Sequence, residues 1–112
     1  MNRYNILENL EYKDTVAITL MFENELSKEI RILMKENQIM KEHKTAFPIT
    51  VEIFEGEIEF GVEKQIHKLV KGDIVSLSAN VPHDLKANKN SIIRLTLAKK
   101  DSVARVSGVL KL

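Results

Sequence analysis

Two histidines, His43 and His83, are the side chains of this sequence best suited to chemistry. Imidazole is the commonest metal-binding side chain, and its ordinary pKa lies near neutrality, so two rings in one pocket could bind a divalent metal ion or move a proton. His43 follows a strand-like run over 38–42, and His83 begins a predicted strand over 83–87. Periodicity does not show whether the two rings meet. A hydrogen-bonded structural role is the alternative for each, and it is the preferred interpretation of His67.

Short strands are expected to position these histidines. Apolar and polar residues alternate along most of the chain, and in 15–22 the alternation places Val16, Ile18, Leu20 and Phe22 on one face. The same period predicts strands over 15–22, 29–35, 38–42, 49–53, 57–62, 65–69, 74–77, 83–87, 92–97 and 103–106. A short helix is expected from Tyr4 to Leu10.

Turn residues separate the strands. Glu55-Gly56 and Lys71-Gly72-Asp73 favour turns, because glycine reaches positive φ without steric cost. A further hairpin is expected at Glu63-Lys64, although neither residue suits a primed turn, so the turn type there stays open. Many short strands without a helix long enough for a crossover predict an all-β, antiparallel sandwich or barrel.

Composition limits the function classes. The 112 residues are 44% hydrophobic and 29% charged, as in a single folded domain spanning 1–112. The net charge is +1 with basic residues spread along the chain, so no nucleic-acid footprint is expected. The absence of cysteine excludes disulfides and thiolate sites. No signal peptide or membrane span is recognisable, and we expect a cytoplasmic protein without membrane contact.

Two predicted strands carry apolar residues on both faces. Ala17 and Met21 do so in the first of them, and Ile92 does so in 92–97. A strand covered on both sides needs something against its outer face, so a partner subunit, most simply in a homodimer, is expected. Scattered surface hydrophobes are the alternative.

The order of these features resembles the cupin family, over roughly residues 35 to 98. The first cupin motif opens with Gly, continues through His-x-His and Glu, and closes with Gly. Aligned on Gly56, His43 takes the first histidine, Thr45 the second, Ile49 the glutamate and Asn37 the opening glycine. The resemblance implies an antiparallel jelly-roll barrel.

The second cupin motif matches at fewer positions. Gly72 and His83 fit it, whereas Ser78, Asn80 and Ala87 replace its Pro, Gly and Asn. Of the three histidines and one glutamate that usually bind metal in the family, His43 and His83 are present. These two are therefore the candidate metal ligands, for Fe, Mn, Zn or Ni.

Three functions are compatible with this sequence. The favoured one is a small cupin barrel that binds a small molecule, and weakly a divalent metal, in an interior lined by residues such as Ile49, Val51, Ile58, Phe60, Val75 and Leu95. The second is a metal-dependent enzyme of dioxygenase or isomerase type with an atypical ligand set. The third is a structural dimer without a site. Whether the protein is an enzyme stays open, since fold alone does not establish a reaction.

Overall fold

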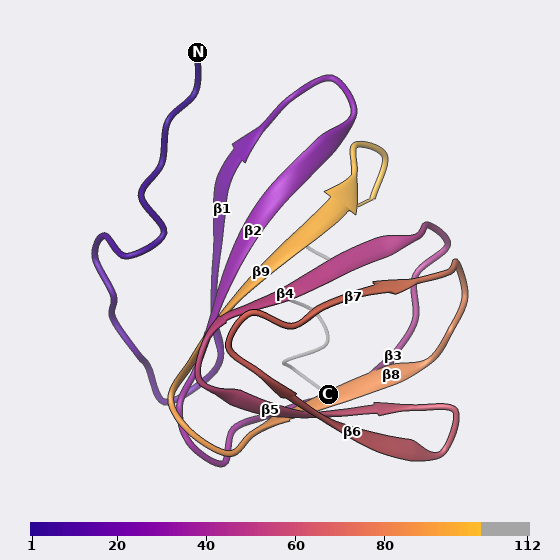
Figure 1. Cartoon of the computed structure of the whole chain (residues 1–112). Coiled ribbons are helices and arrows are strands. Elements are labelled where there is room, and N and C mark those ends of the chain that lie inside the picture. The colour runs from indigo at the N-terminus through magenta and orange to yellow at the C-terminus, as the bar shows by residue number, and fades with distance from the viewer. Residues whose placement is uncertain (102–112) are drawn as a thin grey trace.

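The chain folds as two antiparallel sheets that face one another (Figure 1). This computed structural model describes residues 1–101, which form nine strands. The first sheet has the order β1-β2-β9-β4-β7 and the second β3-β8-β5-β6. The strands are β1 (Ala17–Glu23), β2 (Ser27–Met34), β3 (Ile39–His43), β4 (Ile49–Glu55), β5 (Glu57–Val62), β6 (Gln65–Val70), β7 (Ile74–Leu77), β8 (His83–Ala87) and β9 (Ser91–Ala98).

The core lies between the two sheets. Alternating residues of each strand point inward, as the period of two predicted, and the fully buried ones include Ile30, Ile53, Ile58 and Ile93. Within residues 1–101 the strands pair in two separate antiparallel sheets, so the expected all-β jelly roll is seen as two facing sheets and not as one closed barrel. No helix among these residues has the length and apolarity needed to cross a membrane.

The predicted N-terminal helix is wrong. Residues 6–9 form turns instead, in which the Asn5 side chain accepts a hydrogen bond from the Leu7 amide at 2.9 Å and Asn9 adopts a left-handed φ of 51°. Arg31 donates to the carbonyl oxygens of Ile6 and Glu8, and the Ile6 carbonyl is one that a helix over 4–10 would need for its own hydrogen bonds. So short a segment has too few helical bonds to outweigh these contacts. The strand expected at 103–106 lies outside the described residues.

One predicted side-chain direction in β1 is also wrong. The sequence period places Phe22 inward with Leu20, but a bulge between these residues pairs Leu20 with Ile30 and Phe22 with Glu29. The extra residue reverses the alternation, so that Phe22 points outward with Glu29. A bulge leaves no mark in a hydrophobic pattern.

The outer face of the five-stranded sheet is covered in part by the chain itself. Leu33 and Ile92 point outward yet are 2% and 3% exposed, and the neighbouring Arg31 binds the N-terminal segment through the carbonyls of Ile6, Glu8 and Asn9. Figure 1 shows this segment running beside the sheet. Leu33 and Ile92 are therefore covered within the chain, and the partner subunit stays a prediction.

The Glu63-Lys64 hairpin resolves the open question about its turn. Both residues have positive φ, 53° and 63°, between the paired residues Val62 and Gln65, which is the backbone of a type I′ turn. Because Glu and Lys carry a Cβ, each is strained in this conformation.

We expect Lys64→Gly to stabilise the protein by about 1 kcal/mol, because glycine reaches this φ without strain. Urea unfolding followed by circular dichroism measures the change. Lys68→Gly, in the exposed middle of β6, is the matched control and should destabilise the fold. A loss of stability in Lys64→Gly as large as that in Lys68→Gly would contradict the assigned turn.

Candidate functional site

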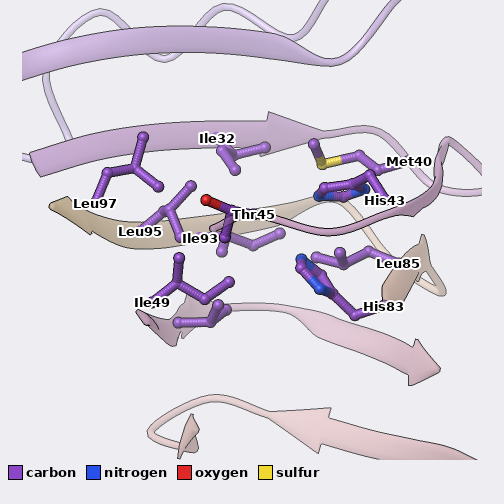
Figure 2. Close-up of a pocket in the computed structure, with 11 residues that line it drawn as sticks. Ile32, Met40, His43, Thr45, Ile49, His83, Leu85, Ile93, Leu95 and Leu97 are labelled. Atoms are coloured by element: carbon purple, nitrogen blue, oxygen red, sulfur yellow. The ribbon is translucent and has the colours of Figure 1, made fainter. Parts of the chain in front are cut away.

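His43 and His83 are direct cross-strand neighbours. They pair at the ends of β3 and β8, after a bulge between Met40 and His43. Both side chains point between the two sheets, where Figure 2 shows their rings at the same end of a pocket. His83 is 3% exposed and His43 is half-buried. The convergence that the sequence could not show is therefore present.

Backbone carbonyls orient both rings. His43 Nδ1 lies 2.7 Å from the Lys41 carbonyl oxygen, and His83 Nδ1 lies 2.9 Å from that of Val81. Because a carbonyl can only accept, Nδ1 is the donor in each contact, and a neutral ring in this tautomer has its lone pair on Nε2. A histidine that binds a metal usually has its other nitrogen held in this way.

The separation of the two rings suits a shared ion. Their centroids lie 4.3 Å apart with an interplanar angle of 60°. With a metal–N bond of about 2.1 Å, the centres of two imidazoles on one ion are about 4.6 Å apart at the right angle of an octahedral ion and about 5.3 Å apart at the angle of a tetrahedral one, so the observed spacing is nearer to the octahedral arrangement. The pair has the spacing of two adjacent ligands of one ion.

A buried aromatic ring supports His83 from behind. Phe60, 2% exposed on β5, stacks on His83 with centroids 5.7 Å apart and planes 15° from parallel. From the sequence alone, Phe60 is expected in the pocket wall, but it does not line the pocket. It holds the imidazole in position instead, because it neighbours β8 within the same sheet.

The pocket around the histidines is narrow and apolar. The space open to the centre of a water molecule inside the pocket is about 20 Å³. This is room for about one water molecule. Of the expected lining residues, Ile49, Val51 and Leu95 are present, whereas Ile58, Phe60 and Val75 are not. The structure adds Ile32, Met40, Thr45, Leu85, Ile93 and Leu97. In Figure 2, Leu95, Leu97 and Ile49 lie at one end of the pocket, and the imidazoles lie at the other end with Met40 and Leu85.

The positions of the two replaced motif ligands also face this pocket. Thr45 and Ile49 both line it, as the alignment with the cupin motif implies, but a hydroxyl is a poor ligand and an isoleucine offers none. Within residues 1–101 no group of three or more His, Cys, Asp or Glu side chains is placed to hold a metal. The donor set fits a two-imidazole site.

Other polar residues close to the two histidines in the sequence, and His67, lie elsewhere. Glu42 lines a groove on the outer face with Gly61 and Asp84. The Gln38 side chain binds the Lys13 carbonyl at 2.7 Å. His67 is exposed on β6 and is not among the residues that line the pocket.

A buried polar pair beside the site is not predictable from the sequence. Thr45 Oγ1 donates a 2.6 Å hydrogen bond to Asp101 Oδ2, and both residues are 5% exposed. Lys28 Nζ holds the Asp101 backbone carbonyl at 2.7 Å. No short-range pattern links residues so far apart in the chain. This hydrogen bond explains why threonine stands at the position of the second motif histidine, because its hydroxyl donates to the buried Asp101 carboxylate.

This chain is similar to known proteins in its three-dimensional structure. No family model matches the chain, and no curated protein matches it. Among solved structures, an RmlC-like cupin protein from Desulfovibrio desulfuricans superposes with a TM-score of 0.80 at 22% identity, covering 88% of this chain and 96% of that one.

A cupin-2 domain containing protein from Shewanella frigidimarina superposes with a TM-score of 0.69 at 14% identity, over 78% of this chain and 84% of that one. KdgF from Halomonas sp. gives a TM-score of 0.72 at 11% identity, over 80% and 84%. The chain has the cupin fold, as its motifs predicted, and identities this low say nothing further about its activity.

We expect Thr45→Val to destabilise the fold by about 1–3 kcal/mol, because it leaves the buried Asp101 carboxylate without this donor. Thr50→Val is the matched control, since Thr50 points outward from the same region and should change stability by less than about 0.5 kcal/mol. Denaturant unfolding compares the two. Equal effects would show that the buried hydrogen bond has no special weight.

Proposed function

We propose that this cupin-fold protein is a binding module that holds a small molecule in its interior pocket. In this proposal His43 and His83 form a weak binding site for a divalent transition metal. The observation that carries the proposal is the pair of oriented imidazoles, 4.3 Å apart, in an otherwise apolar pocket. A few polar groups in an apolar cavity are typical of ligand sites.

The ligand count supports weak binding. A catalytic metal site usually has three protein ligands, and two imidazoles without a carboxylate give a lower affinity. A bound Fe, Mn, Zn or Ni ion would supply a Lewis acid, and the two Nε2 atoms would hold it while the Lys41 and Val81 carbonyls fix the rings.

The size of the cavity restricts the occupant. About 20 Å³ suits an ion or one compact donor group, and a larger ligand requires side chains to move. Met40 lines the pocket beside His43, and its unbranched side chain adapts readily to a new shape. The ligand we propose is therefore small, with an apolar body and one donor group directed at the imidazoles.

A metal-dependent enzyme of dioxygenase or isomerase type is the second candidate. The fixed tautomers of both rings favour it, because protein carbonyls have already oriented the two Nε2 lone pairs. The absence of a third histidine or carboxylate beside them within residues 1–101 favours the binding module.

The assembly and location we propose are a homodimer in the cytoplasm. Ile66 and Ile74 are 73% and 60% exposed on the edge strands β6 and β7, which offers an apolar surface to a second copy. The lack of cysteine fits a reducing compartment.

We expect the purified protein, dialysed against excess Zn²⁺ or Ni²⁺ and then desalted gently, to retain metal that the double variant His43→Ala/His83→Ala loses. Elemental analysis measures the ratio of metal to protein. His67→Ala, which removes an exposed histidine outside the pocket, is the matched control and should retain the wild-type ratio. An equal ratio of metal to protein in the wild type and the double variant would refute the proposed metal-binding site.

We expect a set of small carboxylic acids and aromatic compounds to contain a ligand that raises the unfolding temperature of wild type more than that of the double variant. A ligand at 100 times its dissociation constant adds about 2.7 kcal/mol to the free energy of unfolding. Differential scanning fluorimetry, with and without metal, separates organic ligands that bind alone from those that need the ion. Identical shifts in both proteins would place binding outside the pocket.

A further inference from the structure

An exposed leucine is held in a fixed position at the turn between β1 and β2. Leu26 is 84% exposed. Both polar groups of its backbone are nevertheless bonded: its amide donates to Asn24 Oδ1 at 2.8 Å, and its carbonyl oxygen accepts from the Lys99 amide at 2.9 Å. A side chain this exposed gains little from burial within its own chain. Its ordered backbone instead lowers the entropy that is lost when a partner binds it.

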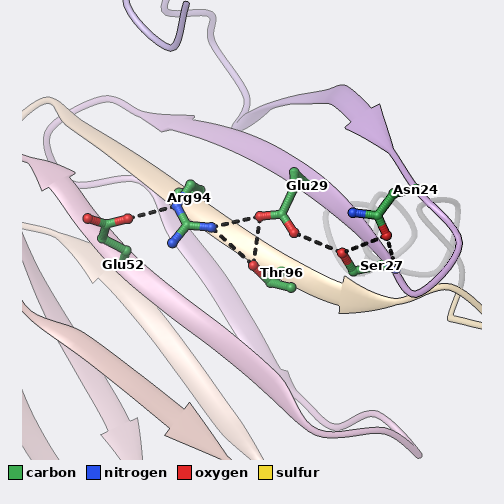
Figure 3. Close-up of polar contacts among 6 residues, drawn as sticks. All are labelled: Asn24, Ser27, Glu29, Glu52, Arg94 and Thr96. Carbon is green, nitrogen blue, oxygen red and sulfur yellow. Dashed lines mark hydrogen bonds and ion pairs between the residues drawn. The ribbon is translucent and has the colours of Figure 1, made fainter. Parts of the chain in front are cut away.

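A polar row connects this turn to the outer face of the five-stranded sheet. Asn24 Oδ1 also accepts from the Ser27 amide at 2.9 Å, and Ser27 Oγ donates to Glu29 Oε2 at 3.2 Å. Figure 3 shows the row continuing through Arg94, which donates to Glu29 and to Glu52 at 2.7 Å each. The hydrogen bond to Glu52 is the largest cause that raises the pKa of Arg94, so the guanidinium stays protonated. The turn is therefore fastened to three strands of the sheet.

The polar row borders a concave surface on the same face. This outer groove has apolar walls from Met21, Phe22 and Phe54 of the sheet and from Tyr4 and Ile6 of the N-terminal segment. The space open to the centre of a water molecule is about 450 Å³ there, against about 20 Å³ in the interior pocket. The outer groove therefore has room for a whole apolar side chain of a partner.

The exposed leucine and the outer groove are neighbours. Asn24 lines the groove, and the same side chain accepts the hydrogen bond from the Leu26 amide. One surface thus carries both an apolar side chain that protrudes and an apolar hollow. Such a surface can pair with its own copy about a two-fold axis, because each copy then supplies the part that the other needs.

The charges on this face allow two copies to approach each other. Arg94 forms ion pairs with Glu29 and Glu52. Its cross-strand neighbour Arg31 supplies a second positive charge, so the formal charges of the four side chains cancel. Two identical surfaces with a net charge would repel each other, since like charges would meet across the interface. This surface has no such net charge among the four residues.

We propose that a second copy of this chain docks on the outer groove, with the Leu26 side chain of each copy in the groove of the other. This inference rests on the homodimer proposed above and names the surface that forms it. Of the two exposed isoleucines considered there, Ile74 pairs with Glu52 and so points to the same face as the groove. Ile66 lies in the four-stranded sheet instead.

Light scattering on a size-exclusion column, at several protein concentrations, tests this surface. Wild type should be a dimer, and Leu26→Asp should raise its dissociation constant at least tenfold, because a carboxylate would be buried in an apolar groove. Ile66→Asp also adds a charge at an exposed position and is the matched control, which should remain as dimeric as wild type. A dimer that Ile66→Asp dissociates and Leu26→Asp does not would leave the homodimer standing and overturn this inference. A monomeric wild type would refute the homodimer itself.

A complementary pair of variants separates a lost contact from a lost fold. Phe54→Arg should also be monomeric, because it places a charge in the groove wall. Mixing it with Leu26→Asp should restore a dimer, since one contact is then intact and the other joins two introduced opposite charges. Circular dichroism shows whether each variant is folded, and folded variants that stay monomeric in the mixture overturn the inference. If Phe54→Arg unfolds, Leu26→Asp decides alone, because so exposed a side chain is not needed for the fold.

Discussion

The pairing of β3 with β8 is the constraint on which the candidate site depends. It sets His43 opposite His83, and the bulge before His43 brings the ring to the inner face at the end of the ladder. Shifting the pairing by one residue would send one imidazole to the solvent face, because side chains alternate with a period of two. Phe60 stacks on the rear of His83, and two backbone carbonyls fix the ring nitrogens, so the geometry of the site is carried mainly by main-chain register.

Backbone conformation explains why the cupin motifs survive with altered residues. The motif glycines Gly56 and Gly72 have φ of 100° and 93°, and a Cβ on Gly56 would collide with Ser91. Asn37 and Asn80 replace motif glycines and have φ of 74° and 64°. Asparagine tolerates the left-handed region better than most residues, so the turns are retained although the glycines are not.

Most of the fold could be predicted from the sequence, because alternation reports directly on which residues face a core. Prediction from alternation failed at the bulge that turns Phe22 outward, because the backbone there departs from a period of two. Prediction of the helix failed at residues 6–9, because hydrogen bonds from Arg31 override the local helical propensity. The candidate site was predictable as far as its two histidines. The Thr45–Asp101 hydrogen bond joins distant parts of the chain and leaves no short-range signal in the sequence.

The position of β3 at the edge of its sheet gives the histidine pair another consequence. Within residues 1–101, this strand of five residues pairs with β8 alone, whereas β8 pairs on both sides. Anything that bridges the two imidazoles would fasten this strand to β8 and slow the exchange of its amide hydrogens with solvent. Binding in the interior pocket would thus be measurable as slower amide hydrogen exchange in β3.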